Sequence, residues 1–261
     1  MSFINTSWWI IPLLVTVFSG VLCPAMGTVL ITHRRLLQVN LISHCVLPGL
    51  ALATALGIDP SVGGVVSGLV GAIAAESLTN KKNQNYEGVM NSILAGSLGL
   101  GVLLIPLLGI RIDLECILFG DLLTATLSDL LRSFIAFSAF IFLMIFGYDK
   151  LVYIGLDPEG AASNGVNVSF LNLALGLTTA LVIVSSMSAV GVVLVIALLS
   201  APTLFGLLQA KALWIAMVRS SIFGLIICLI GFLLAIILNL APGPLIGVLC
   251  VISLILVPKN N

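Results

Sequence analysis

Nine long runs of apolar residues cover most of this 261-residue chain. A transmembrane α-helix needs roughly 20 consecutive apolar residues, and most of the runs approach or exceed that length. The runs cover residues 8–31, 36–56, 62–78, 89–108, 127–146, 170–185, 190–208, 213–238 and 245–257. Turn-forming sequences such as 57–60 and 240–244 separate them. The pattern predicts an all-α integral membrane protein, a polytopic bundle of eight or nine transmembrane helices forming a single domain over residues 1–261.

The composition excludes most other classes of protein. Apolar residues make up 60% of the chain and charged residues 8%, whereas soluble domains carry roughly 25% charged residues. A chain with so few charges cannot cover a soluble surface, so we expect the lipid bilayer to be its solvent. The formal net charge is zero, so no basic patch predicts a nucleic-acid partner.

Basic residues predict the orientation, because short loops rich in Lys and Arg stay in the cytoplasm. If the N-terminus lies outside, the same side of the membrane receives Arg34, Arg35, Lys81, Lys82, Lys150, Lys211 and Lys259. This predicts nine spans with the C-terminus inside. If the first run re-enters or lies in the interface, the count becomes eight and the N-terminus lies inside.

One polar cluster lies within the second apolar run. Asn40 and His44 are four residues apart and share one face of a helix, and Ser43 adds a hydroxyl nearby. Pro48 lies four residues beyond His44, so it cannot donate to the His44 carbonyl, which is left free. Imidazole and oxygen donors suit a divalent transition metal, and an ionisable group inside a span is costly unless it has a function. The alternative is a histidine that forms a hydrogen bond between helices.

The other acidic residues lie near the ends of the runs. Glu76 and Glu87 flank the Lys81–Lys82 loop, and we expect them to solvate it. Three further acids fall in a predicted external segment, where they attract cations, dock a partner or form a solvated loop: Asp113, Glu115 and Asp121. No pair of carboxylates lies at the centre of a run, which argues against a proton-coupled carrier.

The longest predicted cytoplasmic loop covers residues 148–168 and contains a short helix. Asp157 is a good N-cap, Pro158 suits the first helical position and Gly165 can end the helix. The acid Glu159 favours the positive end of the helix dipole. We interpret the segment as a knob presented to a cytoplasmic partner, with an ordinary structured loop as the alternative.

Four motifs in order resemble the manganese, zinc and iron permeases of ABC transporters, often called the ABC-3 family. Residues 40–49 are similar to Asp-Ala-x-Ser-His-x-x-Leu-Pro-Gly, and residues 118–121 to a Leu-Phe-Gly element. Residues 157–165 are similar to Asp-Pro-Glu-x-Ala-x-x-x-Gly, and residues 190–202 to Val-Gly-x-x-Leu-x-x-Ala-Leu-Leu-x-x-Pro. The chain has no P-loop sequence, so any ATP would be bound by another chain.

The resemblance implies a fold related to the vitamin B12 and siderophore importers and a multi-pass location in a bacterial-type plasma (inner) membrane. It implies a homodimer with cytoplasmic ATP-binding subunits and an extracytoplasmic metal-binding protein. It also implies that the chain is no enzyme and holds no permanent cofactor, with Mn²⁺ or Zn²⁺ as the transported ion. The metal pair of the family maps onto Asn40 and His44, and the path beside it would be shaped by Ser43, Pro48 and Gly49. The coupling helix that contacts the ATPase maps onto Asp157, Pro158, Glu159, Ala161 and Gly165.

One residue departs from the family pattern. Asn40 stands where the family usually has Asp, which removes a negative charge from the proposed path. Either His44 acts with Asn40 and the free carbonyl, or a residue of a second protomer completes the site. Two alternatives to an ATP-driven importer of free ions remain: a secondary carrier that needs no ATPase, and a permease for a metal chelate.

Overall fold

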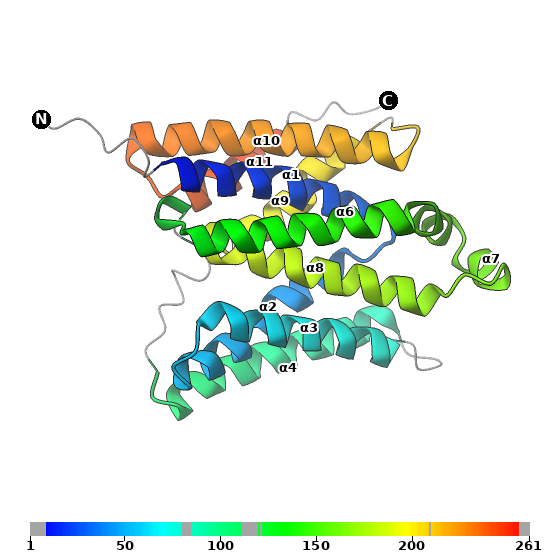
Figure 1. Cartoon of the computed structure of the whole chain (residues 1–261), viewed down its shortest axis with the longest axis horizontal. Coiled ribbons are helices and arrows are strands. Elements are labelled where there is room, and N and C mark those ends of the chain that lie inside the picture. The colour runs from blue at the N-terminus through cyan, green and yellow to red at the C-terminus, as the bar shows by residue number, and fades with distance from the viewer. Residues whose placement is uncertain (1–8, 80–84, 111–119, 121, 209, 256–261) are drawn as a thin grey trace, which may run out of the picture. The chain divides into compact units, whose positions relative to one another are not determined.

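The computed structural model describes residues 9–79, 85–110, 120, 122–208 and 210–255. Within these ranges the chain is all-helical (Figure 1). The helices are α1 (Ile10–Thr32), α2 (Leu36–Ala55), α3 (Pro60–Thr79), α4 (Tyr86–Leu107), η1 (Leu122–Thr124), α6 (Leu127–Leu156), α7 (Pro158–Ser163), α8 (Val168–Val190), α9 (Val192–Leu207), α10 (Leu213–Leu238) and α11 (Pro242–Ile255).

Each predicted apolar run overlaps mainly with one helix of this set. In the described residues, seven helices are long and apolar enough to cross a membrane, and α9 and α11 are shorter apolar helices. The prediction of an all-α polytopic fold is confirmed. The main difference is α6, predicted to end near residue 146, which continues to Leu156. The helix ends there because Pro158 disfavours a helical conformation at the residue before it.

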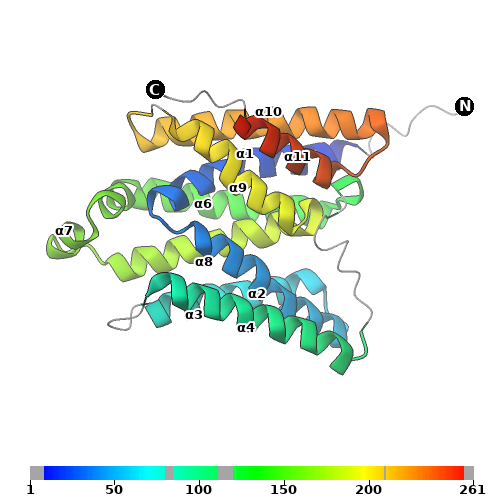
Figure 2. The ribbon, with the colours of Figure 1, turned by 180° about the vertical axis from the view of Figure 1, so that it is seen from behind.

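The chain divides into two compact units, with boundaries near residues 31, 113, 137 and 184. The first unit holds α1, α9, α10 and α11 with the start of α6 and the end of α8. In this unit α9, α10 and α11 pack against one another (Figure 2). Ser221 Oγ on α10 donates a hydrogen bond of 2.9 Å to the Val21 carbonyl of α1. This hydrogen bond joins α1 to α10.

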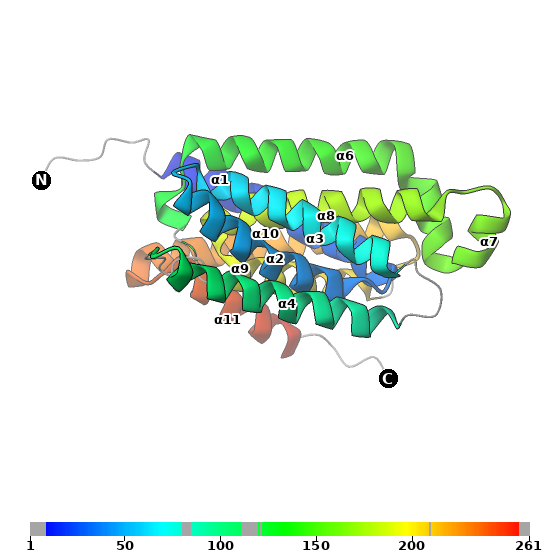
Figure 3. The same ribbon diagram turned by 90° about the horizontal axis from the view of Figure 1, so that it is seen from below.

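The second unit holds α2, α3, α4 and α7 with the remaining parts of α6 and α8. Its helices α2, α3 and α4 lie side by side (Figure 3). Gly49 of α2 and Gly63 of α3 approach each other closely, because a Cβ atom on either would collide with the backbone oxygen of the other. Small residues allow such contact between helix backbones inside a membrane.

A buried ion pair stands at one end of this group of helices. Arg35 Nη1 lies 2.7 Å from Glu76 Oε2, and Glu76 is only 4% exposed. The expectation that Glu76 solvates the basic loop is therefore wrong. Its carboxylate turns into the group of helices because Arg35, the residue before α2, supplies the opposite charge there.

The outward faces of the helices are apolar, as a bilayer requires. Large side chains that are more than half exposed include Val66 of α3, Ile145 of α6 and Ile237 of α10. The four described cysteines, Cys23, Cys45, Cys228 and Cys250, are buried with free thiols.

Several predicted features lie outside the described residues. These are the basic residues Lys81, Lys82 and Lys259, the acids Asp113, Glu115 and Asp121, and all of the Leu118–Asp121 element except Gly120.

Candidate functional site

Asn40 and His44 lie on the accessible stripe of α2. Both side chains are half-exposed, whereas their neighbours Leu41, Ile42 and Cys45 are buried. The helix is continuous from Leu36 to Ala55, so the spacing of four residues places Asn40 and His44 on one face, as the sequence predicts. The stripe is thus open on the surface of its own unit.

Neither side chain is engaged by its own chain. Within the described residues no hydrogen bond or ion pair involves the side chain of Asn40 or His44. No group of three His, Cys, Asp or Glu side chains in the same part of the chain could hold a metal ion. One imidazole and one amide can offer a dication a brief contact, and a closed site would need further ligands.

The residues around this pair, Ser43, Pro48 and Gly49, are positioned by contacts inside α2 and with the neighbouring helices. Ser43 is buried, and its Oγ has no hydrogen-bond partner among the described residues. At Pro48, α4 crosses α2 closely, since a Cβ atom on Gly101 would lie 3.1 Å from the Pro48 nitrogen. Gly49 contacts Gly63, as described above. Pro48 and Gly49 therefore fix where α3 and α4 cross α2, next to His44.

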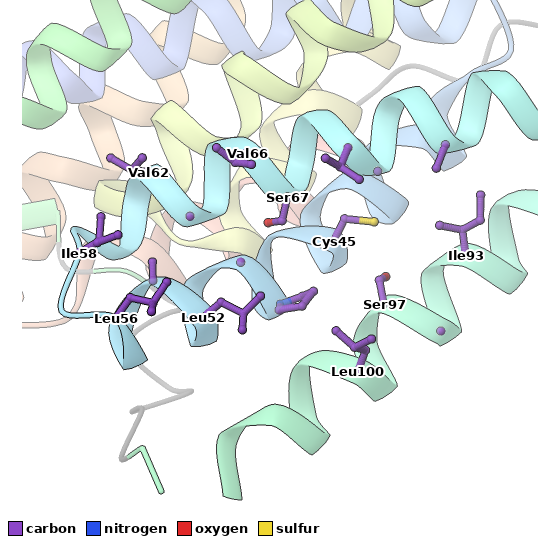
Figure 4. Close-up of a pocket in the computed structure, with 18 residues that line it drawn as sticks. Cys45, Leu52, Leu56, Ile58, Val62, Val66, Ser67, Ile93, Ser97 and Leu100 are labelled. Atoms are coloured by element: carbon purple, nitrogen blue, oxygen red, sulfur yellow. The ribbon is translucent and has the colours of Figure 1, made fainter. Parts of the chain in front are cut away.

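A cavity of about 690 Å³ opens further along α2, beyond His44 (Figure 4). Pro48 and Leu52, four and eight residues after His44, belong to its lining. Its lining comes from α2, α3 and α4 and includes Cys45, Leu52, Val66, Ser67 and Leu100. The lining contains no charged residue, and Asn40 and His44 are not part of it. Because it is almost wholly apolar, this cavity is unsuited to a partly dehydrated cation.

The predicted cytoplasmic helix is present as α7, Pro158–Ser163. Asp157 is its N-cap, and Asp157 Oδ1 accepts a hydrogen bond of 2.9 Å from the Gly160 N–H. Gly165 has a φ of +80° just beyond the helix, a conformation that glycine adopts readily. Glu159 is exposed, whereas Ala161 is fully buried. Ala161 therefore packs α7 against the rest of the chain, and the side chain of Glu159 is accessible to a partner protein.

His33 lies just before α2 and contacts the end of α6. A Cβ atom on Gly155 would lie 3.6 Å from His33 Nε2, which is buried and has no hydrogen-bond partner among the described residues. Burial lowers the pKa of His33 from its ordinary 6.5 to about 4; nearby Arg35 also lowers it, and a hydrogen bond to the Leu151 backbone opposes the shift. His33 is therefore neutral at physiological pH.

Two glycines from different motifs touch in the first unit. Gly120 and Gly191 have φ values of +65° and +85°, and a Cβ atom on Gly120 would lie 2.5 Å from the Gly191 nitrogen. Gly191 separates α8 from α9. Gly120 thus packs against the break between these two helices.

The profile of the ABC 3 transport family matches residues 8–259. The chain belongs to this family. This ABC-3 protein is 30% identical to the manganese transport system membrane protein MntC of Listeria monocytogenes, over 88% of its own length and 82% of the relative's. It is 31% identical to the chelated iron transport system membrane protein YfeD of Yersinia pestis, over 89% and 78% of the two chains.

A solved structure of PsaBC from Streptococcus pneumoniae in complex with Fab matches with a TM-score of 0.84 and 27% identity, covering 97% of this chain and 91% of the other. The resemblance inferred from the four motifs is confirmed, and the ABC-3 protein is a multi-pass membrane protein.

Sequence reasoning missed a second polar cluster inside this ABC-3 protein. Gln38 of α2 is fully buried, and neither its amide nitrogen nor its oxygen has a partner among the described residues. A Cβ atom on Gly176 of α8 would lie 2.5 Å from Gln38 Nε2. Asn172, one turn from Gly176 on α8, also has a buried side-chain oxygen without a described partner. The signal was present, since Gln38 is a polar residue within an apolar run.

Proposed function

We propose that this ABC-3 protein is the membrane-spanning permease subunit of an ATP-driven importer of divalent metal ions, manganese or zinc. Membership of an ABC transport family implies an ATP-binding subunit and a substrate-binding protein as partners. The permease is a single domain over residues 1–261 that acts as a homodimer in a bacterial plasma (inner) membrane. Its metal-binding partner lies outside, and α7 faces the ATPase in the cytoplasm.

One observation carries the proposal: the half-exposed and unengaged pair Asn40 and His44 on one face of α2. In a bilayer such groups are expensive unless they face a polar path or a partner. A transit site must also release its ion, which suits two weak ligands better than a closed cage. A second protomer would supply the remaining ligands.

The decisive experiment is metal uptake by His44→Ala in cells that contain the complete transporter. We expect uptake of radioactive manganese to be lost while complex assembly and basal ATP hydrolysis persist. Thr54→Ala is the matched control, because Thr54 is on the same helix and its hydroxyl already bonds to the Leu50 carbonyl. Wild-type uptake by His44→Ala would remove His44 from the mechanism.

A metal chelate is the second candidate substrate, since the relative YfeD belongs to a chelated iron transport system. Competition separates the two candidates: free Mn²⁺ or Zn²⁺ blocks uptake of labelled manganese if the substrate is the free ion, and only chelates block it otherwise. An ATPase-independent carrier is disfavoured by the family, and transport by the permease alone in proteoliposomes would support it.

A further inference from the structure

A second cavity, of about 750 Å³, lies between the later part of α6 and the first part of α8. Both helix segments belong to the second unit, and Figure 1 shows them side by side with α7 beyond their ends. The volume falls within the roughly 300–1,000 Å³ of pockets that enclose most of a small ligand. We call this cavity the α6–α8 groove.

The α6–α8 groove is apolar along one part and polar at one end. Phe142 and Phe146 stand exposed on its rim with ring centroids 4.6 Å apart, and Leu143 and Leu171 are buried in it. The hydroxyl of Thr178 is already bonded to the Ala174 carbonyl, so it adds no free polar group to the apolar part. This part therefore favours a hydrocarbon ligand.

The polar end is formed by Lys150, Asn164 and Asn167. Lys150 is exposed, and no carboxylate in the described part of the chain pairs with its ammonium group. Asn164 Nδ2 donates to Tyr153 Oη at 2.7 Å and to the Gly160 carbonyl at 2.9 Å, which ties this end to α7. A single unpaired cation beside two amides favours a ligand that carries an anion.

The length of the groove matches one leaflet of a bilayer. Ala139 and Lys150 mark its two ends on α6, and eleven residues of helix span about 16 Å. Half of a hydrocarbon core of roughly 30 Å is about 15 Å. In the proposed orientation Lys150 therefore lies at the cytoplasmic membrane surface, with the apolar part of the groove in the inner leaflet.

We propose that the α6–α8 groove binds one anionic glycerophospholipid of the inner leaflet, with its phosphate at Lys150 and an acyl chain along Phe142, Phe146 and Ala174. The apolar lining, the single cation at the interfacial end and the leaflet-long spacing all match this class of ligand. The 690 Å³ cavity beside α2 lacks a charged lining residue and offers no such headgroup contact. The proposal uses the predicted orientation but no transport step.

The test measures lipid retention by the purified full-length chain, using native mass spectrometry after incubation with phosphatidylglycerol or phosphatidylcholine. We expect the wild type to prefer phosphatidylglycerol by about fivefold, the effect of one basic residue at a membrane surface. Lys150→Gln should remove this preference, and Lys211→Gln, a matched loss of a lysine outside the groove, should keep it. Ala174→Trp fills the apolar part and should reduce binding of both lipids.

Two results would overturn the proposal. One is an unchanged phosphatidylglycerol preference in Lys150→Gln. The other is competition by free glycerol phosphate as effective as that by the lipid, because the anion site would then take a soluble phosphate without an acyl chain. If Ala174→Trp fails to fold, Lys150→Gln and the competition decide alone. Metal uptake is measured on the same variants. Lys150→Gln that loses the lipid preference but keeps metal uptake shows that the lipid site is independent of the proposed function. His44→Ala that loses metal uptake but keeps the lipid preference shows the same from the other side.

Discussion

Arg35 Nη1 and Glu76 Oε2, 2.7 Å apart, join the start of α2 to the last turn of α3. The guanidinium carbon of Arg35 also lies 5.8 Å from the centre of the Tyr86 ring, the first residue of α4. One cation therefore connects the ends of the three helices that carry and surround the Asn40–His44 pair. Removing one member of a buried ion pair leaves an uncompensated charge, which is costlier than removing both.

We expect Glu76→Gln to destabilise the protein by about 3–5 kcal/mol, because Arg35, whose side chain is only 13% exposed, then lacks its counter-charge. The double variant Arg35→Met/Glu76→Gln should recover much of this loss. Thermal unfolding in detergent measures both, with the double-mutant cycle giving the coupling between the two side chains. Additive effects of the two substitutions would show that the pair contributes no coupling.

Asn40→Asp should strengthen attraction for a dication, because it restores a carboxylate beside His44. We expect the KM for manganese uptake to fall about tenfold, the equivalent of ~1.4 kcal/mol. The same change in the His44→Ala background should have no effect on uptake, since the imidazole is required. An unchanged or higher KM in the single variant would place Asn40 off the path of the ion.

The half-buried His33, whose Nε2 atom is inaccessible, makes the free energy of unfolding depend on pH. Its pKa is about 4 in the folded chain and near 6.5 when exposed, so the unfolded state binds the extra proton first as the pH falls. The contribution of neutral His33 to the stability is fully present above about pH 6.5 and is lost progressively towards pH 4, by at most about 3–4 kcal/mol. We expect the melting temperature of the wild type to fall over this range and that of His33→Gln to fall less. Parallel pH profiles of the two proteins would contradict this assignment.

Glu159 and Ala161 of α7 should respond differently to substitution. Glu159→Arg changes an exposed side chain, so we expect weaker co-purification of the ATPase. The reversed charge at the N-terminus of α7 should lower the stability by no more than about 1 kcal/mol. Ala161→Leu overpacks a fully buried position and should lower the stability by about 1–3 kcal/mol. Ser169→Ala, exposed at the start of α8, is the control for both. Normal ATPase retention by Glu159→Arg would show that α7 does not form the contact.

The sequence by itself determined the apolar helices, the cap of α7 and the common face of Asn40 and His44. These are local properties, set by hydrophobic length, by N-cap chemistry and by the 3.6-residue period of a helix. Only the tertiary structure decided that Glu76 is buried against Arg35, that Gly49 meets Gly63, and that Gln38 lies beside Gly176. Each of these pairs joins residues 14 to 138 positions apart in the chain. No local pattern encodes such partners, because burial and pairing depend on which helix faces come together.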